Sequence, residues 1–431
     1  MARLPDPRAL LAGLDLPAAS PVVAAVSGGG DSVALLLLLA RSGRSVIAVT
    51  VDHALRPESA GEAQRVAMLC RSLGVAHRIM RWEGDKPATG LMQAAREVRY
   101  RLLAKAAHDA GASVVLTGHN HDDRVETLLM RKQRGGAGPG LSSIAPATLY
   151  DQRIWFLRPL LGFRRAALRD WLTAEGVGWI DDPSNEADRF ERVRIRRDVA
   201  AMPGPAFAEA SAQIAAAGKK RMARGATLAD MLTRHVSALL PGLLRLDPAF
   251  AREDAAIELL RLLAGIAGGL AHWPAQEKAE RAHAGLAADR AATLGRALFD
   301  VRSAGIFIRR ESRNMPPAAP LPAGRLWDGR FRLAGDVAGM VAPWGRAAIL
   351  PPDLPEGVSP ALAKAALATL PSMAAHPASL AHAGLAEPAL GPWSRFLPCW
   401  DLAAAAAVAR LFRVNEPPPA PLGLNIALGE A

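Results

Sequence analysis

The chain has 431 residues, of which 50% are hydrophobic and 22% charged, a balance typical of folded globular proteins and not of disordered chains. No apolar run approaches the roughly 20 residues that cross a bilayer, and no secretory signal precedes the first element, so we expect a cytoplasmic protein without a membrane partner. The two cysteines, Cys70 and Cys399, are too far apart for a CxxC metal or redox pair, while the net charge of +11 favours a nucleic-acid partner.

Short apolar runs alternate with helical patterns over the first 180 residues. Strands are expected at residues 21–26, 45–51, 77–82, 113–117 and around 155–156. Helices are expected at residues 31–41, 58–73, 91–110, 121–134 and 164–175. Repeated strand–helix units predict an α/β fold with a doubly wound parallel sheet. Its ligands should lie beyond the carboxyl ends of the strands.

The composition changes after about residue 200, so we expect three parts. Residues 1–200 form the catalytic domain, residues 205–315 a helical middle domain without a strong strand signal, and residues 323–431 a small, weakly patterned C-terminal region. A proline-rich linker at residues 316–322 separates the last two.

A glycine-rich turn between the first strand and the first helix is the most informative motif. Consecutive glycines allow a tight turn whose N–H groups approach an anion, and the helix directs its positive end at the same place. No Walker lysine is present. The alternative is a simple helix cap, although a cap does not require three glycines. The motif therefore predicts a phosphate-binding loop, with Asp31 as a ligand for phosphate-bound Mg²⁺; its residues are Ser27, Gly28, Gly29, Gly30, Asp31 and Ser32.

Polar residues also follow the second predicted strand, and two arginines lie in the third predicted helix. Asp52 or His53 are candidates to contact a nucleoside, and Arg56 to balance phosphate charge, although an ordinary loop is the alternative. Arg96 and Arg99 share one helical face, which suits an anion, although on spacing alone a solvated charged face is the better interpretation.

A cluster of carboxylates opens the helix after the fourth strand. His119 lies in the turn, Asp122 and Asp123 in the first helical turn, and Glu126 can share a face with either. Such carboxylates bind Mg²⁺ or an ammonium group, or act as a general base, although they also complement a helix dipole. His119 and His121 lack further ligands at zinc spacing.

The ordered set of motifs resembles the tRNA(Ile)-lysidine synthetase family of PP-loop ATP pyrophosphatases, which have an adenine nucleotide alpha hydrolase-like fold. The likeness is strong over residues 20–200, thin over residues 205–335 and absent beyond. One departure is Arg124, where the family usually has Gln. The strings that carry the resemblance are SGGGDS, VDHALRPES, AREVRY, GHNHDDRVET, RPLL and DDPSN followed by RVRIRR.

This resemblance implies a ligase that uses ATP and Mg²⁺ to adenylate the 2-carbonyl oxygen of the wobble cytidine in CAU-anticodon isoleucine tRNA. Free lysine then displaces AMP, and Asp31, His119, Asp122, Asp123 and Glu126 are the catalytic candidates. Arg131 joins Arg96 and Arg99 as an anion-binding candidate. The implied tRNA-contacting residues are Arg189, Arg192, Arg194, Arg196 and Arg197.

Two other interpretations remain open from the sequence. A PP-loop tRNA thiolase shares the adenylation step, but such enzymes generally need paired cysteines, which Cys70 and Cys399 do not supply. A catalytically inactive tRNA-binding relative is the other, motivated by Arg124 and the unmatched C-terminus, and opposed by the intact loop at residues 27–32.

Overall fold

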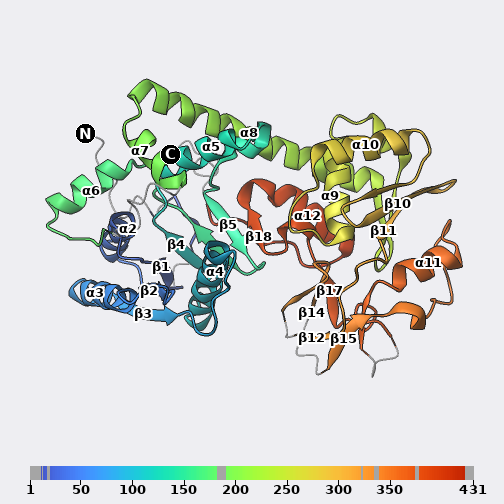
Figure 1. Cartoon of the computed structure of the whole chain (residues 1–431), viewed down its shortest axis with the longest axis horizontal. Helices are drawn as coiled ribbons and strands as arrows, with labels where there is room; N and C mark the ends of the chain where they lie inside the picture. Colours follow the sequence, from blue (N-terminus) through green and yellow to red (C-terminus); the bar gives the residue numbers. More distant parts are fainter. Residues whose placement is uncertain are drawn as a thin grey trace. The chain divides into compact units, whose positions relative to one another are not determined.

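A computed structural model describes residues 11, 13–16, 20–181, 191–321, 324–333, 339–373 and 378–422. The chain divides into two compact units (Figure 1). The first comprises Met1–Met222, Pro398–Trp400 and Pro418–Ala431, and the second comprises Ala223–Leu397 and Asp401–Pro417. No helix of the described part is long and apolar enough to cross a membrane.

The first unit is built on the predicted parallel sheet. Its strands before residue 160 run in the order β5-β6-β4-β1-β2-β3, and all neighbours are parallel except β5 and β6. The first two strands after β1 along the chain lie on one side of β1 and β4 lies on the other, so the strand order reverses at β1. The strands are β1 (Val22–Ala25), β2 (Val46–Asp52), β3 (Ala76–Arg81), β4 (Val114–Thr117), β5 (Ala147–Tyr150) and β6 (Ile154–Leu157).

Helices follow the strands as expected, and the doubly wound α/β prediction is confirmed. The apolar run of α2 is buried throughout because it packs against β1, β2 and α6. α4 lies against the central strands, so its side chains reach the edge where those strands end. The helices of this unit are α2 (Gly30–Ala40), α3 (Ser59–Ser72), α4 (Leu91–Asp109), α5 (His121–Gln133), α6 (Arg165–Ala174) and α7 (Glu191–Ala200), with the 3₁₀ turn η1 at Gly138–Ser142.

An apolar cluster fixes α7 against α5. Val125 and Leu128 of α5 pack with Ile195 and Val199 of α7, and Phe207 completes the cluster. Because Ile195 and Val199 lie on one face of α7, the arginines between them are directed to the neighbouring faces. The long helix α8 (Gly204–His235) follows, and the boundary between the two units falls within it.

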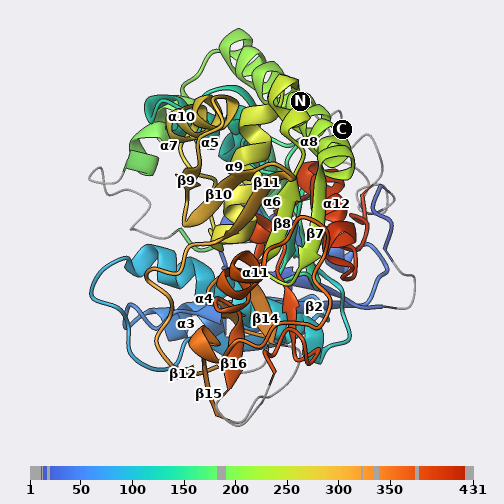
Figure 2. The same ribbon diagram turned by 90° about the vertical axis from the view of Figure 1, so that its right-hand side faces the viewer.

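The second unit contains the expected helices of the middle region, α9 (Ala256–Gly268) and α10 (Gln276–Ala287), but also a five-stranded antiparallel sheet. Figure 2 shows its strands side by side in the order β7-β8-β11-β10-β9. The Ala- and Leu-rich pattern concealed these strands, which are short and continuous in apolar character. They are β7 (Val236–Leu240), β8 (Leu243–Leu246), β9 (Ala292–Leu294), β10 (Ala297–Arg302) and β11 (Gly305–Arg310), with the 3₁₀ turn η3 at Pro248–Arg252.

Two small three-stranded sheets, β12-β15-β16 and β13-β14-β17, follow with two helices. The three-part domain division remains a prediction. The boundary between the two compact units falls near residue 222. The strands of the two small sheets are β12 (Ala319–Pro320), β13 (Leu326–Trp327), β14 (Phe331–Leu333), β15 (Met340–Pro343), β16 (Pro371–Met373) and β17 (Ala386–Pro388). A further strand, β18 (Phe396–Pro398), belongs to neither of these two sheets. The helices are α11 (Pro360–Leu367) and α12 (Leu402–Phe412), with 3₁₀ turns η4 (Gly345–Ala347), η5 (Gly391–Trp393) and η6 (Cys399–Asp401).

Candidate active site

A cavity of about 530 Å³ opens at the carboxyl ends of β1, β2 and β4 in the first unit. Its lining comes from the glycine-rich turn, from α4 and from the starts of α5, α6 and α7. This position, beside the strand where the order reverses, is where doubly wound sheets bind ligands.

The glycine-rich turn is shaped as an anion-binding loop. Gly29 is the N-cap of α2 in extended conformation, and the backbone N–H groups of Gly28, Gly29 and Gly30 donate to no described residue. The Ser32 hydroxyl donates to the Gly29 carbonyl at 2.8 Å and accepts from the Ser27 amide at 3.2 Å, which holds the turn in place. Free amides at a helix N-terminus attract phosphate.

Two glycines are required by close approach. Gly28 has a φ of +91°, and a Cβ there would lie 2.7 Å from the Ile180 side chain. The Ile180 amide also donates to the Gly28 carbonyl at 2.9 Å, so residue 180 lies directly on the loop. A Cβ at Gly118 would lie 2.7 Å from the Asp31 carbonyl oxygen, which explains the glycine after β4 on steric grounds.

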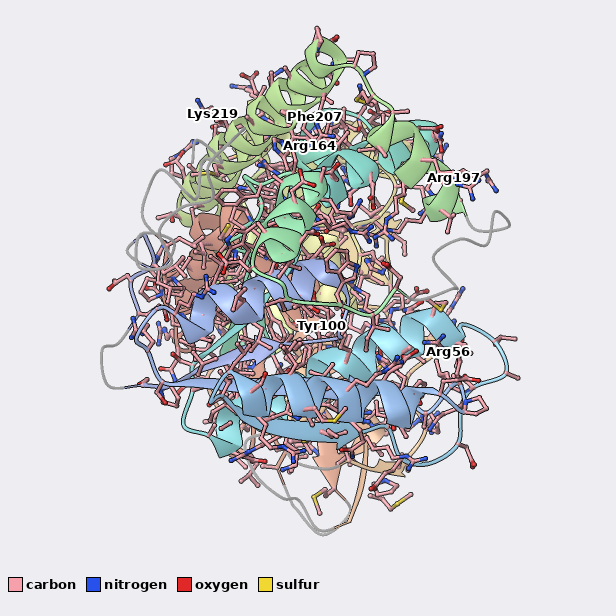
Figure 3. The ribbon with its side chains drawn as sticks, turned by 90° about the vertical axis from the view of Figure 1, so that its left-hand side faces the viewer. Arg56, Tyr100, Arg164, Arg197, Phe207 and Lys219 are labelled. Atoms are coloured by element: carbon pink, nitrogen blue, oxygen red, sulfur yellow. The ribbon has the colours of Figure 1, made fainter. Side chains whose placement is uncertain are left out.

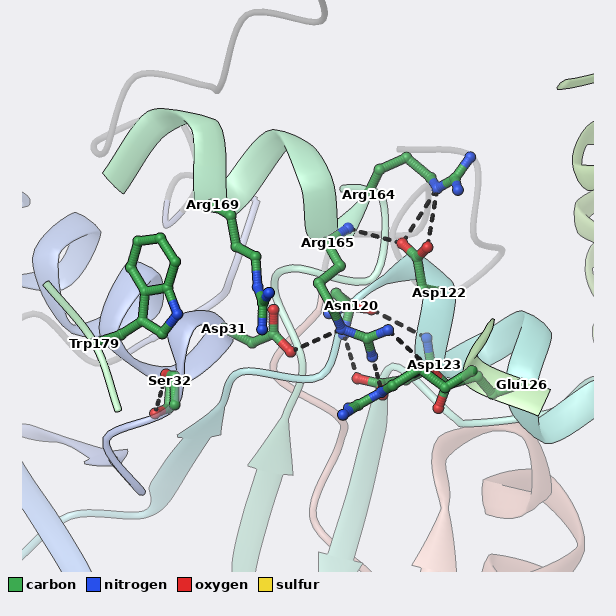
Figure 4. A network of polar contacts seen from close by, with 12 residues as sticks. Asp31, Ser32, Asn120, Asp122, Asp123, Glu126, Arg164, Arg165, Arg169 and Trp179 are labelled. Carbon is green, nitrogen blue, oxygen red and sulfur yellow. Dashed lines mark hydrogen bonds and ion pairs between the residues drawn. The ribbon is translucent and has the colours of Figure 1, made fainter. Parts of the chain in front are cut away.

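Arg165 links the carboxylates of the site (Figure 4). Its guanidinium contacts Asp31 Oδ2 at 3.3 Å, Asp123 Oδ1 at 2.9 Å and Glu126 Oε1 at 2.8 Å. Arg192 of α7 binds the last two as well, at 3.1 Å each. The expected cluster of carboxylates therefore exists, but it is neutralised by arginines of the chain itself.

Asp123 owes its place to the start of α5. Its backbone N–H donates to Asn120 Oδ1, and its Oδ2 accepts from the Asn120 backbone N–H, both at 3.0 Å. This capping box begins the helix at His121. The same carboxylate presents Oδ1 to Arg165, so one residue serves both the fold and the site.

Their surroundings shift the pKa values of the two buried carboxyl groups, Asp123 and Glu126, in opposite directions. Burial raises the pKa of Asp123, and Glu126 raises it further, against the effects of Arg165 and Arg192. Burial also acts to raise the pKa of Glu126, but the guanidiniums of Arg165, Arg192 and Arg196 outweigh it, and the net pKa is lowered. Carboxyl groups whose pKa values are driven apart are suited to different roles.

His119 lines the same cavity as a neutral imidazole. Burial, followed by the charges of Arg158 and Arg99, lowers its pKa well below the ordinary value. Its Nδ1 is 2.9 Å from the Thr117 hydroxyl, which orients the ring. His121, the other histidine of the motif, lies outside the cavity lining and bonds to Ser211.

Asp122 is separated from the other carboxylates. It accepts from the Arg165 amide at 2.7 Å and from Arg164 Nε at 3.2 Å, and it does not line the cavity. Figure 4 shows it turned toward the start of α6, and Figure 3 shows Arg164 close to Phe207, whose ring centre is 3.6 Å from the guanidinium carbon.

The structure brings only part of the second-strand motif to the cavity. His53 lines it, and burial lowers its pKa. Asp52 is buried, accepts from the Ala54 amide at 2.8 Å and does not line the cavity. Arg56 bonds to Glu62 at 3.0 Å and is not in the lining either. Of these three residues, the structure therefore brings only His53 to the cavity lining.

The remaining arginines are distributed unequally. Arg96 and Arg99 line the cavity beside Tyr100, whereas Arg131 donates to the Gly140 carbonyl at 2.6 Å outside it. Arg192 and Arg196 line the cavity over Glu126, and Arg194 and Arg197 are exposed on α7 (Figure 3 labels Arg197). Arg189 and the string Asp182 to Asn185 lie outside the described residues.

Comparison with known proteins decides the family. A model of the PP-loop domain matches residues 8–202. The tRNA(Ile)-lysidine synthase of Mesorhizobium japonicum is 45% identical, covering 93% of this chain and 94% of that protein. That of Rhizobium meliloti is 39% identical, covering 93% of each. The chain belongs to the tRNA(Ile)-lysidine synthase family.

Membership of the tRNA(Ile)-lysidine synthase family extends along the chain, well beyond the motifs of residues 20–200. Among solved structures, a U34-tRNA thiolase of Methanococcus maripaludis with its [4Fe-4S] cluster covers 50% of this chain and 77% of that chain, at 14% identity and a TM-score of 0.42. This likeness is too distant to distinguish one activity from another. Cys70 and Cys399 do not line the cavity, and burial raises the pKa of the Cys70 thiol to about 11.

The departure from the lysidine synthase motif at Arg124 is placed away from the chemistry. Arg124 is buried on α5 outside the cavity lining, and burial lowers its pKa. Its Nε has no hydrogen-bond partner in the described part of the chain. Arg124 therefore lies outside the lining that contains Asp31 and Asp123.

Sequence reasoning missed several residues that shape the site. Arg165 stands four residues after the RPLL string, and Arg169 one helical turn later; both line the cavity. Ile180 precedes the DPSN string and lies on the loop. One signal in the sequence could have indicated Arg165 and Arg169. Both lie near the start of a helix that follows a strand, and helix starts lie at the ligand-binding edge of such folds.

Proposed function

We propose that the protein uses ATP to join free lysine to carbon 2 of the wobble cytidine in CAU-anticodon isoleucine tRNA, forming lysidine and releasing AMP and pyrophosphate. The observation that carries this proposal is the glycine-rich loop, whose unbonded amides face a cavity that also holds Asp31, His119 and Asp123. Membership of the lysidine synthase family supports the choice of tRNA and amine.

In the first step the loop binds the triphosphate, and the cytidine O2 attacks the α-phosphorus while pyrophosphate leaves. The amides at the start of α2 stabilise the phosphate charge without moving, which is how preorganised dipoles accelerate phosphoryl transfer. Arg169, on the cavity wall next to Gly30, adds a positive charge there.

Magnesium suits this site through Asp31. Its Oδ1 is buried without a hydrogen-bond partner in the described structure, and Mg²⁺ is usually held by one or two carboxylates together with phosphate oxygens. No cluster of three or more metal-binding side chains occurs in the described residues, so phosphate oxygens would supply the other ligands. When bound, the ion neutralises charge on the phosphates.

In the second step the ε-amine of lysine attacks carbon 2, and the bond from that carbon to O2 breaks, so that O2 leaves with AMP. The amine must lose a proton first, because the ordinary pKa of lysine is about 10.4. Asp123, whose pKa is raised, is the proposed acceptor. Glu126 stays ionised under its arginines, and neutral His119 can donate or accept a hydrogen bond without carrying charge.

The tRNA is proposed to meet exposed arginines such as Arg194 and Arg197 on α7, together with Arg189 and the helical part of residues 205–315. Contacts from guanidiniums to phosphates position a nucleic acid without reading its sequence. The reaction is proposed to take place in the cytoplasm.

A direct assay tests the proposal. The protein is incubated with ATP, Mg²⁺, labelled lysine and a CAU-anticodon isoleucine tRNA transcript, with a transcript carrying another wobble base as the control. Label should enter the first transcript only, with one AMP and one pyrophosphate for each lysine. Incorporation that depends on a sulfur donor, or tRNA binding without ATP turnover, would refute it.

A further inference from the structure

The arginines that line the cavity divide into two groups by their partners. Arg165 and Arg192 contact Asp31 or Asp123 of the lining, and Arg196 contacts the buried Glu126 behind it. Arg169 pairs with Asp181 at 3.1 Å. Arg96 and Arg99 differ, because neither has a carboxylate within 4 Å among the described residues. At this end of the cavity, therefore, no carboxylate of the described residues forms an ion pair with Arg96 or Arg99.

Tyr100 organises this end of the cavity. Its hydroxyl accepts from Arg96 Nη2 and from Arg158 Nη2, both at 3.3 Å. Its ring packs with Tyr150 and Phe156 in a three-ring cluster, with ring centres 5.7 and 4.5 Å away. These bonds hold the Arg96 and Arg158 guanidiniums beside the phenol, and the Arg99 guanidinium carbon lies 5.9 Å from the ring centre. We call Arg96, Arg99, Tyr100 and Arg158 the arginine–tyrosine centre.

The charges within this centre act strongly on one another. Burial is the main cause that lowers the pKa of Arg99, and Arg96, Arg158 and Arg192 lower it further. Burial acts to raise the pKa of Tyr100, but Arg158, Arg96 and Arg99 outweigh it, so the net pKa is lowered. Like charges kept together at partial burial are costly unless an anion joins them.

The chemistry of the cavity selects one anion. The triphosphate already has the free amides of the loop, the start of α2 and Arg169. Asp123 lies on the same cavity as Arg99, and Arg192 connects the two, since it bonds to Asp123 and influences Arg99. A molecule with a carboxylate at one end and an amine at the other complements an unpaired guanidinium near a carboxylate.

Resting on the proposed function, we propose that Arg99 binds the α-carboxylate of free lysine. Arg96 and Arg158, fixed through Tyr100, add positive charge, and the ε-amine is left to extend toward Asp123. The site thereby distinguishes lysine from amines that lack the carboxylate.

The experiment compares lysine with cadaverine, which is lysine without its carboxylate, as the amine substrate. The Arg99→Gln substitution should lower kcat/KM for lysine about 10- to 100-fold, the range typical of a lost charged hydrogen bond, and change kcat/KM for cadaverine by less than about threefold. Arg99→Lys should restore part of the preference for lysine. Arg101→Gln, on the same helix but exposed and outside the cavity, is the matched control.

Other outcomes overturn this assignment. If Arg99→Gln impairs both amines equally and raises KM for ATP, the anion is a phosphate of ATP; if KM for tRNA rises instead, it is a tRNA phosphate. Failure of the wild-type protein to use either amine is a different result, because it rejects the proposed function.

A titration tests the binding site without turnover. The chain has only two tyrosines, so the Tyr150→Phe variant reports the ionisation of Tyr100 alone by ultraviolet absorbance. Lysine at saturating concentration should raise the pKa of Tyr100, because the carboxylate offsets the neighbouring guanidiniums, and cadaverine should not. Equal effects of the two amines, or no effect of lysine, would contradict the proposal.

Discussion

Arg165 and Asp31 lie 134 positions apart in the sequence, yet Arg165 Nε is 3.3 Å from Asp31 Oδ2. The same guanidinium bonds to Asp123 and Glu126 of α5. The end of the cavity proposed for phosphate and the end proposed for the amine are thus connected by one side chain. Mg²⁺ bound to Asp31 Oδ1, as proposed, would share that carboxylate with Arg165, which contacts Oδ2.

The Arg165→Gln variant should be markedly less stable than the wild type. Removing one partner of a buried ion pair leaves uncompensated charge, which costs about 3–5 kcal/mol, and here Asp123 and Glu126 would both lose a partner. The free energy of unfolding from urea denaturation measures this. Arg41→Gln, which removes the exposed pair with Glu175, is the control and should have a much smaller effect. Equal stability of the two variants would mean that Arg192 and Arg196 alone compensate the charges of Asp123 and Glu126.

The Gly118→Ala substitution should weaken ATP binding about tenfold or more. Its Cβ would lie 2.7 Å from the Asp31 carbonyl oxygen, and backbone cannot yield as a flexible side chain does, so the start of α2 must shift. Isothermal titration calorimetry with ATP and Mg²⁺ measures the effect. Gly61→Ala on α3, where a Cβ would meet nothing within 4 Å, should leave the affinity unchanged. Unaltered affinity in Gly118→Ala would show that the close approach of Gly118 to Asp31 is not needed for ATP binding.

The Asn120→Ala variant should be about 1 kcal/mol less stable than the wild type. Its activity should also fall, by more than this loss of stability explains. Loss of a helix N-cap costs about that much, because the Asp123 backbone N–H loses its acceptor, Asn120 Oδ1. The bond from the residue-120 backbone N–H to Asp123 Oδ2 survives in alanine, but the helix start that places this carboxylate is weakened. Urea denaturation and steady-state kinetics with lysine provide the two readouts. Asn120→Ser keeps an acceptor for the Asp123 amide and should recover most of both. If Asn120→Ala changes stability without changing KM or kcat, the cap does not orient the catalytic carboxylate.

Stability should fall when the pH is lowered from about 6.5 toward 4, in part because of His121. Burial, then the charge of Arg124, lowers the pKa of His121 to about 4. The unfolded chain therefore binds a proton in this range that the folded chain does not, so protonation favours unfolding. At 1.36 kcal/mol per unit of pKa, the contribution reaches at most about 3 kcal/mol.

The test of this pH dependence is urea denaturation at several pH values, with the His121→Gln variant beside the wild type. The free energy of unfolding of the variant should depend less on pH between 6.5 and 4 than that of the wild type. The exposed His108, replaced by Gln, should leave the dependence unchanged. Parallel curves for His121→Gln and wild type would contradict a neutral His121 in the folded state.

The parallel sheet and its loop were predictable because their signals are local. An apolar run followed by three glycines and a helix predicts β1, the turn and α2 from adjacent residues alone. The family resemblance, carried by motifs of the first 200 residues, was likewise confirmed. By contrast, the strands β7 to β11 were not predicted, because short apolar strands in an Ala- and Leu-rich segment have the same composition as a buried helix.

The partners of the site residues could not be read from the sequence. Nothing near Asp31 in the chain indicates Arg165, and nothing near Glu126 indicates Arg192, because these contacts depend on how α6 and α7 pack against α5. Asp122 and Asp123 look equivalent as neighbours, yet the capping box directs one to the cavity and the other to Arg164. Such assignments require the fold.

The most direct test of the central claim follows one oxygen atom. A transcript carrying a heavy-oxygen isotope at O2 of the wobble cytidine is converted with unlabelled ATP and lysine, and the products are analysed by mass spectrometry. If the loop presents the α-phosphorus to that oxygen, the heavy isotope will appear in the phosphate of AMP and be absent from pyrophosphate. Recovery of the isotope in pyrophosphate, in water or still in the tRNA product would contradict the account.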